Sequence, residues 1–181
     1  IVEEAVARRG FRKPALLCDD TPYGQSGRVR LEAALRKRNV KPVYSGRFAV
    51  GDVDMSLQVQ HAMYAGTDVL LVYGIGPELA GIANSMKRVG WGVDIVGSWT
   101  LGMASFARGA GRNGDGATMP QTFVESAASA PRATRFVEAY HARFEKPIEV
   151  AVAAAQGYDP PPLLRRATPQ AGGLAAPPPT T

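Results

Sequence analysis

The sequence predicts an α/β fold built on a doubly wound, mostly parallel sheet of five strands. Short apolar runs alternate with segments of helical periodicity over roughly the first 120 residues, a pattern typical of a parallel sheet covered by helices on both sides. The clearest run, Val69–Tyr73, is apolar throughout and shows no polar alternation, as expected of a strand buried on both faces. Right-handed crossovers between the strands follow from this arrangement.

The individual elements have local signals. Ile1, Val2, Ala5 and Val6 fit one helical stripe, which ends at Gly10. The predicted strands cover residues 15–18, 42–48, 69–73, 94–97 and, as a short fifth strand, 117–120. The predicted later helices cover residues 25–38, 54–65, 77–89, 131–144 and 148–158.

Turn and cap residues separate these elements. The cluster Asp19–Gly24 predicts a turn after the first strand, and Asp54 is suited to cap a helix by accepting backbone N–H groups. Pro77 suits the first turn of its helix because it needs no N–H partner there. A Gly-rich stretch, for which neither helix nor strand is predicted, covers residues 102–116.

Composition excludes several classes of protein. The formal net charge is +5, and the excess lies in residues 1–50, which hold 11 Lys or Arg and 5 Asp or Glu. We interpret the basic residues of this segment as the solvated face of a helix, so no nucleic-acid partner is predicted. The single cysteine, Cys18, excludes an intrachain disulfide, and no apolar run is long enough for a membrane span. The helical stripe already begins at Ile1, as is typical of the interior of a helix. We therefore expect the natural N-terminus, with any signal segment, to precede Ile1.

Candidate binding residues follow the strands. In a doubly wound sheet, ligands bind beyond the carboxyl ends of the strands. The loops expected there contribute aromatic and polar groups typical of a small-molecule pocket: Tyr23, Ile75, Trp99, Thr100 and Gln121.

No catalytic constellation is recognisable, so the sequence predicts a binding protein without enzymatic activity, cofactor or metal. Asp19 and Asp20 after the first strand suggest an alternative, a degenerate receiver domain with a magnesium site, but Tyr73-Gly74 stands where such a domain needs its acceptor Asp. The other interpretation is that Asp20 and Thr21 organise the turn. The two histidines lie within predicted helices, without a metal-binding partner at useful spacing.

An ordered set of motifs resembles one family. The matching segments are Lys13-Pro-Ala-Leu-Leu-Cys-Asp-Asp-Thr-Pro-Tyr-Gly-Gln-Ser-Gly-Arg28, Gly51-Asp-Val-Asp-Met55, Ala65-Gly-Thr-Asp-Val-Leu-Leu-Val-Tyr-Gly74 and Ala155-Gln-Gly-Tyr-Asp159. Together they resemble the periplasmic substrate-binding proteins of ABC transporters for branched-chain amino acids. The resemblance implies a fold of two α/β lobes that close on a ligand about a hinge. Residues 1–159 would form the second, ligand-binding lobe, and residues 160–181 a Pro- and Gly-rich disordered tail.

The resemblance also implies a function and a site. The chain would bind a small amino acid or an organic or aromatic acid, as the periplasmic component of an ABC importer, with a membrane permease as its partner. The implied ligand contacts are Tyr23, Gly74, Ile75, Trp99 and Thr100. A ligand-sensing domain of a transcription regulator, which shares the two-lobed fold, is a further alternative.

Two departures from the family pattern bear on this interpretation. Trp99 stands where amino-acid-binding members offer an acidic residue to the ligand ammonium, so an aromatic or other organic acid is favoured. Pro160-Pro161-Pro162 interrupts the helix that the family continues, which suggests a truncated or frame-altered end.

Overall fold

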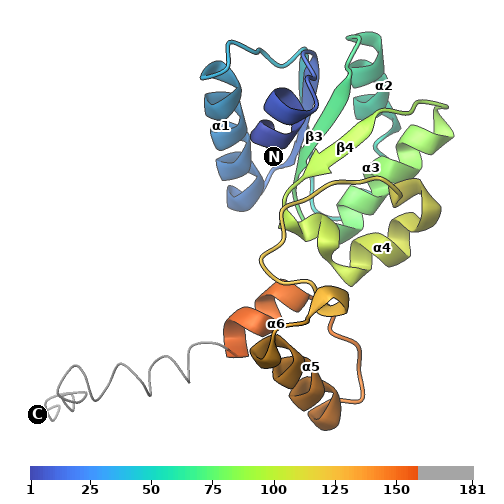
Figure 1. Cartoon of the computed structure of the whole chain (residues 1–181). Coiled ribbons are helices and arrows are strands. Elements are labelled where there is room, and N and C mark those ends of the chain that lie inside the picture. Colours follow the sequence, from blue (N-terminus) through green and yellow to red (C-terminus); the bar gives the residue numbers. More distant parts are fainter. Residues whose placement is uncertain (159–181) are drawn as a thin grey trace, which may run out of the picture. The chain divides into compact units, whose positions relative to one another are not determined.

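The structure is a computed structural model that describes residues 1–158 (Figure 1). The tail predicted for residues 160–181 lies outside the described residues. The chain divides into two compact units, Ile1–Gln121 and Thr122–Thr181, and each is described by itself. A ligand-binding lobe over residues 1–159 stays a prediction.

The first unit is built on a four-stranded parallel sheet in the order β2-β1-β3-β4. Its strands are β1 (Pro14–Asp19), β2 (Tyr44–Phe48), β3 (Val69–Tyr73) and β4 (Asp94–Gly97). The α/β fold with a doubly wound parallel sheet is therefore confirmed. All residues of β1 are buried, as expected of a central strand covered on both faces.

The predicted fifth strand is wrong: residues 117–120 make only a single parallel bridge, between Val96 and Thr118. The Gly97 N–H donates to the Thr118 carbonyl at 2.9 Å, and the Thr118 N–H donates to the Ile95 carbonyl at 2.9 Å. Pro120 has no N–H to donate to a longer ladder.

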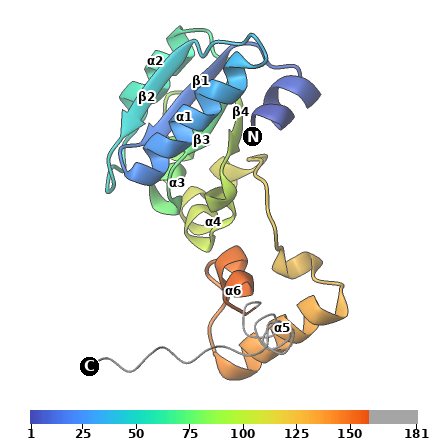
Figure 2. The ribbon, with the colours of Figure 1, turned by 90° about the vertical axis from the view of Figure 1, so that its left-hand side faces the viewer.

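Helices cover both faces of the sheet. In Figures 1 and 2, α1 (Pro22–Arg36) and the first helical segment (Glu3–Arg8, with wide π-type turns) lie on one side. On the other side lie α2 (Ser56–Tyr64) and α3 (Gly76–Arg88), with α4 (Ala104–Ala110) packed against α3. The first side forms an apolar cluster of Val2, Ala5, Val6, Leu16, Cys18, Leu31, Leu35, Val40, Val69, Leu71 and Val96. The strand residues that point the other way, such as Leu17 and Leu70, join a second cluster with α2, α3 and α4.

Three local predictions need correction. α1 begins at Pro22 rather than residue 25, because Thr21 caps it and Pro22 occupies its first turn. The Gly-rich stretch contains the helix α4, which is held by the buried side chains of Phe106 and Ala110. Asp54 accepts the Ser56 N–H at 2.9 Å, as expected of a cap. The N-cap residue is nevertheless Met55, and α2 begins at Ser56.

Arg9 ties the first helical segment to the sheet. Its guanidinium donates to Glu4 Oε1 at 2.9 Å, to Asp94 Oδ2 at 3.0 Å and to Thr118 Oγ1 at 2.9 Å. These partners come from the segment itself, from the start of β4 and from the bridging residue. The side chain of Arg9 thus joins three parts of the chain that are far apart in sequence.

The second unit holds α5 (Pro131–Arg143) and α6 (Ala151–Tyr158). Phe136 is its central buried side chain and contacts the rings of Phe123, Tyr140 and Tyr158. His141 lies 2.7 Å from Glu125. Within residues 1–158, no helix is long and apolar enough to cross a membrane.

The fold predicts an unreactive thiol. Cys18 lies within β1, and burial raises its pKa to about 12. At pH 8 only about one thiol in ten thousand would be ionised, and the thiolate is the reactive form. We expect Ellman's reagent to react with the native chain far more slowly than with free N-acetylcysteine, and with one thiol per chain once urea unfolds it. Native labelling at the rate of the free thiol would contradict this placement.

Candidate functional site

The candidate site lies at the carboxyl edge of the sheet. All four strands are parallel, so their ends at Asp19, Phe48, Tyr73 and Gly97 share one edge. The order β2-β1-β3-β4 means that the chain winds outward in opposite directions from β1 and from β3. The ends of these two strands therefore mark the topological switch point, where doubly wound folds bind ligands.

Asp19 organises the β1 side of the switch point. Its carboxylate is 1% exposed, and Oδ1 accepts the Thr21 N–H at 3.1 Å, the Thr21 hydroxyl and the Gly24 N–H at 3.0 Å. Asp20 is exposed. The turn is thus organised by Asp19 and Thr21 rather than by Asp20 and Thr21.

Tyr23 stands on the first turn of α1 and meets Tyr73 at the end of β3. The two rings lie 4.7 Å apart between centroids, tilted by 42°. Gly27 makes room for this pair, because a Cβ atom there would lie 2.2 Å from the Tyr73 ring. The aromatic pair bridges the β1 and β3 sides of the switch point.

The Tyr23 hydroxyl is buried without a hydrogen-bond partner in the described part of the chain. Burial raises the pKa of Tyr23, and the side chains of Ser98, Tyr73 and Thr100 lie near enough to influence it. A buried hydroxyl that lacks a partner is unfavourable.

Hydrogen bonds join the loops after β3 and β4. The Thr100 hydroxyl, which is 2% exposed, donates to the Gly74 carbonyl at 2.6 Å and also bonds the Ser98 hydroxyl. Trp99, between these two residues, is half-buried, and its carbonyl accepts the side-chain N–H of Gln121 at 2.8 Å. The backbone around the indole is therefore fixed by neighbours on both sides.

The five sequence-predicted contacts all lie at the carboxyl edge, although they differ in what they offer. Tyr23 presents a buried hydroxyl, Trp99 a half-buried indole and Ile75 an exposed side chain. Gly74 is buried and Thr100 uses its hydroxyl to hold the Gly74 loop. Their contact with a ligand stays a prediction.

Sequence reasoning missed two residues of the site, Tyr73 and Ser98. Tyr73 was expected at the strand end but not named as a binding residue, yet it is the ring partner of Tyr23. Ser98 follows β4 directly and is 2% exposed. Their position at a strand end was a usable signal, because residues there face the edge where ligands bind.

Metal chemistry finds no support in residues 1–158. No group of three or more His, Cys, Asp or Glu side chains is placed to hold an ion there. His61 is exposed and contacts the Tyr44 ring, whereas His141 pairs with Glu125 in the other unit.

Comparison with known proteins identifies relatives of the fold. A sequence model of a family described as periplasmic binding protein matches residues 1–178. The leucine-binding protein LivK from Thermotoga maritima superposes with a TM-score of 0.77 at 24% identity, covering 95% of this chain and 49% of that protein. An extracellular ligand-binding receptor from Rhodopseudomonas palustris gives a TM-score of 0.80 at 21% identity, covering 97% and 51%.

A third structure was solved with its ligand. The branched-chain amino acid transporter substrate-binding protein LivJ from Streptococcus pneumoniae, in complex with isoleucine, gives a TM-score of 0.75 at 20% identity. It covers 92% of this chain, which spans 47% of that protein. The chain thus spans about half the length of these structures. No curated protein sequence matches the chain significantly.

The role of Asp19 is testable by stability. Asp19→Ala removes the acceptor of two backbone N–H groups and one hydroxyl, so we expect the free energy of unfolding to fall by about 2 kcal/mol in urea titration. The matched control Asp20→Ala should change it by less than about 0.5 kcal/mol, because Asp20 is exposed. Equal effects of the two substitutions would contradict the assignment.

Proposed function

Because this chain belongs to the periplasmic binding protein family, we propose that it forms part of the solute receptor of an ABC importer. In this proposal the receptor works in the periplasm, closes about a hinge around a small ligand and delivers it to a membrane permease. The role is binding rather than catalysis. The observation that carries the proposal is the switch point itself, where the Tyr23–Tyr73 ring pair and the half-buried Trp99 come from the ends of neighbouring strands and Thr100 holds the Gly74 loop.

The charges at the site disfavour a free amino acid. Asp19 and Glu78 are the buried acidic side chains among residues 1–158. Both already accept backbone N–H groups, Asp19 from Thr21 and Gly24 and Glu78 from Gly51 at 2.8 Å. A ligand ammonium would therefore lack a buried carboxylate of its own, and an unpaired buried cation is unfavourable.

The aromatic side chains at the site favour a ligand that contains an aromatic ring. Trp99 is half-buried at the edge, and an indole stacks well on another ring. The Tyr23 hydroxyl can donate to a ligand oxygen at the switch point. We therefore propose an aromatic or other organic acid as the ligand, with Tyr23, Gly74, Ile75, Trp99 and Thr100 as the contacts, and a small amino acid as the second candidate.

Other readings of the sequence find less support. The family to which the chain belongs argues against the magnesium site of a degenerate receiver domain. A sensor domain of a transcription regulator would use the same lobe. Co-purification with a permease, rather than with operator DNA, would distinguish the importer role from the sensor role.

A first prediction concerns Trp99. In the two-lobed protein, Trp99→Ala should weaken binding of an aromatic carboxylate such as phenylacetate about tenfold in calorimetry, because stacking area is lost. Trp91→Ala is the matched control, since Trp91 precedes β4 at the opposite edge of the sheet.

The chain of 181 residues alone should bind with millimolar or undetectable affinity, because it supplies about half of a receptor. Unchanged binding by Trp99→Ala, or micromolar binding by the chain alone, would contradict the proposal.

A second prediction concerns Tyr23. Tyr23→Phe removes a buried hydroxyl that has no hydrogen-bond partner among residues 1–158, so thermal stability without ligand should stay equal or rise. Ligand affinity in the two-lobed protein should nevertheless fall about fivefold to tenfold, because a hydrogen bond to the ligand is lost. Tyr64→Phe should change neither quantity, since Tyr64 is 79% exposed. If affinity is unaffected by Tyr23→Phe, the hydroxyl does not contact the ligand.

A further inference from the structure

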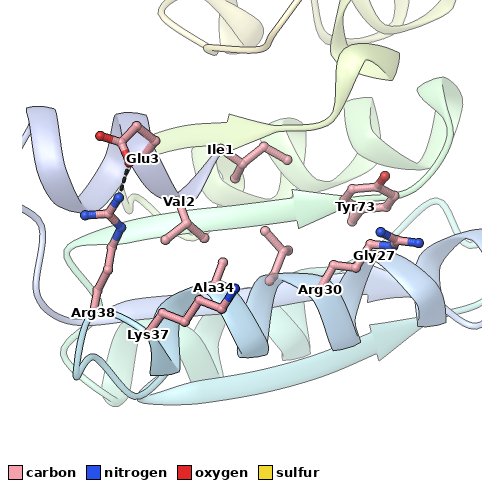
Figure 3. A pocket seen from close by; sticks show the side chains of 10 residues that line it. Ile1, Val2, Glu3, Gly27, Arg30, Ala34, Lys37, Arg38 and Tyr73 are labelled. Carbon is pink, nitrogen blue, oxygen red and sulfur yellow. Dashed lines mark hydrogen bonds and ion pairs between the residues drawn. The ribbon is translucent and has the colours of Figure 1, made fainter.

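A cavity lies at the amino edge of the sheet, the edge opposite the candidate site. This amino-edge cavity has a volume of about 530 Å³ and lies between the last turns of α3, the segment that leads into β4 and the loop after α4. Its walls are formed by residues between 83 and 117, so it lies wholly within the first unit. It is separate from the hollow beside α1, on the other face of the sheet (Figure 3).

The floor of the amino-edge cavity is apolar and includes an indole. Met86 and Ile95 are 5% and 7% exposed and belong to the apolar cluster that the sheet forms with α2, α3 and α4. Trp91, Val93 and Ala117 are half-buried and pack against the same cluster. A cavity of this volume is typical of small-molecule sites, and an indole can stack on a planar ring of a ligand.

Hydrogen bonds fix the loop after α4, which forms one wall of the cavity. Asn113 Nδ2 donates to Asn84 Oδ1 at 2.9 Å, and Asn84 Nδ2 donates to the Gly109 carbonyl at 3.0 Å. Within the loop, the Asp115 N–H donates to the Arg112 carbonyl at 3.2 Å. The loop is thus attached to α3 through Asn84. In a binding site, such attachment lowers the conformational entropy lost when a ligand binds.

The free charges around the cavity are mostly positive. Lys87 near the end of α3 and Arg112 in the loop are exposed, and neither side chain has a hydrogen-bond or ion-pair partner in the described part of the chain. Of the two acids, Asp94 already accepts a hydrogen bond from Arg9 at 3.0 Å. The side chain of Asp115 is exposed and has no such partner among the described residues. Two free cations against one free acid favour an anionic ligand.

We propose that the amino-edge cavity binds an aromatic phosphate, with the ring against Trp91 and the phosphate group bound by Lys87 and Arg112. A phosphate monoester carries a charge of about −1.5 to −2 at pH 7, which matches two cations. Arg binds phosphate through paired N–H groups and Lys binds it as a point charge. A carboxylate would leave one of the cations uncompensated, and a neutral ring would leave both. The cavity is independent of the proposed receptor site, because the two share no residue.

The two tryptophans allow the two sites to be observed separately. The sequence contains only Trp91 and Trp99, so an isotope-labelled sample of the full chain gives two indole N–H signals in NMR, which Trp91→Phe assigns. Titration with naphthyl phosphate should shift the Trp91 signal to saturation and leave the Trp99 signal in place. Naphthoate should bind about threefold more weakly and naphthalenemethanol about tenfold more weakly, because the ring is the same and the charge is smaller.

Substitutions test which residues bind the probe. The double variant Lys87→Gln with Arg112→Gln should weaken naphthyl phosphate about tenfold and naphthalenemethanol less than about twofold. Arg36→Gln with Lys37→Gln is the matched control, because it removes the same charge from exposed residues at the end of α1, on the other face of the sheet. Ala117→Leu should weaken all three probes by filling the floor, with thermal unfolding used to show that each variant is folded.

Four results would overturn the proposal. Equal losses in the two double variants would indicate general attraction to a basic protein rather than a site. Equal affinity for naphthyl phosphate and naphthalenemethanol would show that the cations do not contribute. Unchanged binding by Ala117→Leu would place the probe elsewhere. A shift of the Trp99 signal in place of the Trp91 signal would place the probe at the carboxyl edge, and so would reject the amino-edge cavity without affecting the proposed receptor function.

Discussion

The buried carboxylate of Asp19 is the constraint on which the carboxyl edge depends. It ends β1 and accepts hydrogen bonds from Thr21 and Gly24, so the chain must turn at once into α1. That turn places Tyr23 over the sheet rather than in solvent. The turn also requires a glycine at position 24, because a Cβ atom there would lie 2.1 Å from the Asp19 carboxylate. One acid therefore fixes the strand end, the helix start and the first ring of the candidate site.

The β3 side of the switch point is fixed by the packing of Gly74 and by the hydroxyl of Thr100. Gly74 lies so close to Phe48 that a Cβ atom would be 2.7 Å from its ring. Thr100 then holds the Gly74 carbonyl from the loop after β4. Both loops are consequently held by contacts within the protein. In the proposed receptor site, this order lowers the conformational entropy lost on binding. The proposal gives the partly exposed Trp99 the main contact with the ligand.

Tyr73 links the two sides of the carboxyl edge. It is the last residue of β3, and its ring packs against Tyr23 from the first turn of α1. Gly27 leaves space for this contact, because a Cβ atom there would lie 2.2 Å from the Tyr73 ring.

The sequence by itself determined the fold class and the positions of the four strands, because unbroken apolar runs such as Val69–Tyr73 are typical of a parallel sheet covered on both faces. It also placed the candidate residues at the carboxyl edge, since strand direction and topology dictate which loops meet there. Tertiary structure decided the rest. α4 forms in a Gly-rich stretch because Phe106 is buried against α3, and the expected fifth strand reduces to one bridge at Thr118. The pairing of Tyr23 with Tyr73 also needs the fold, because side-chain contacts between distant segments depend on packing that no local pattern contains.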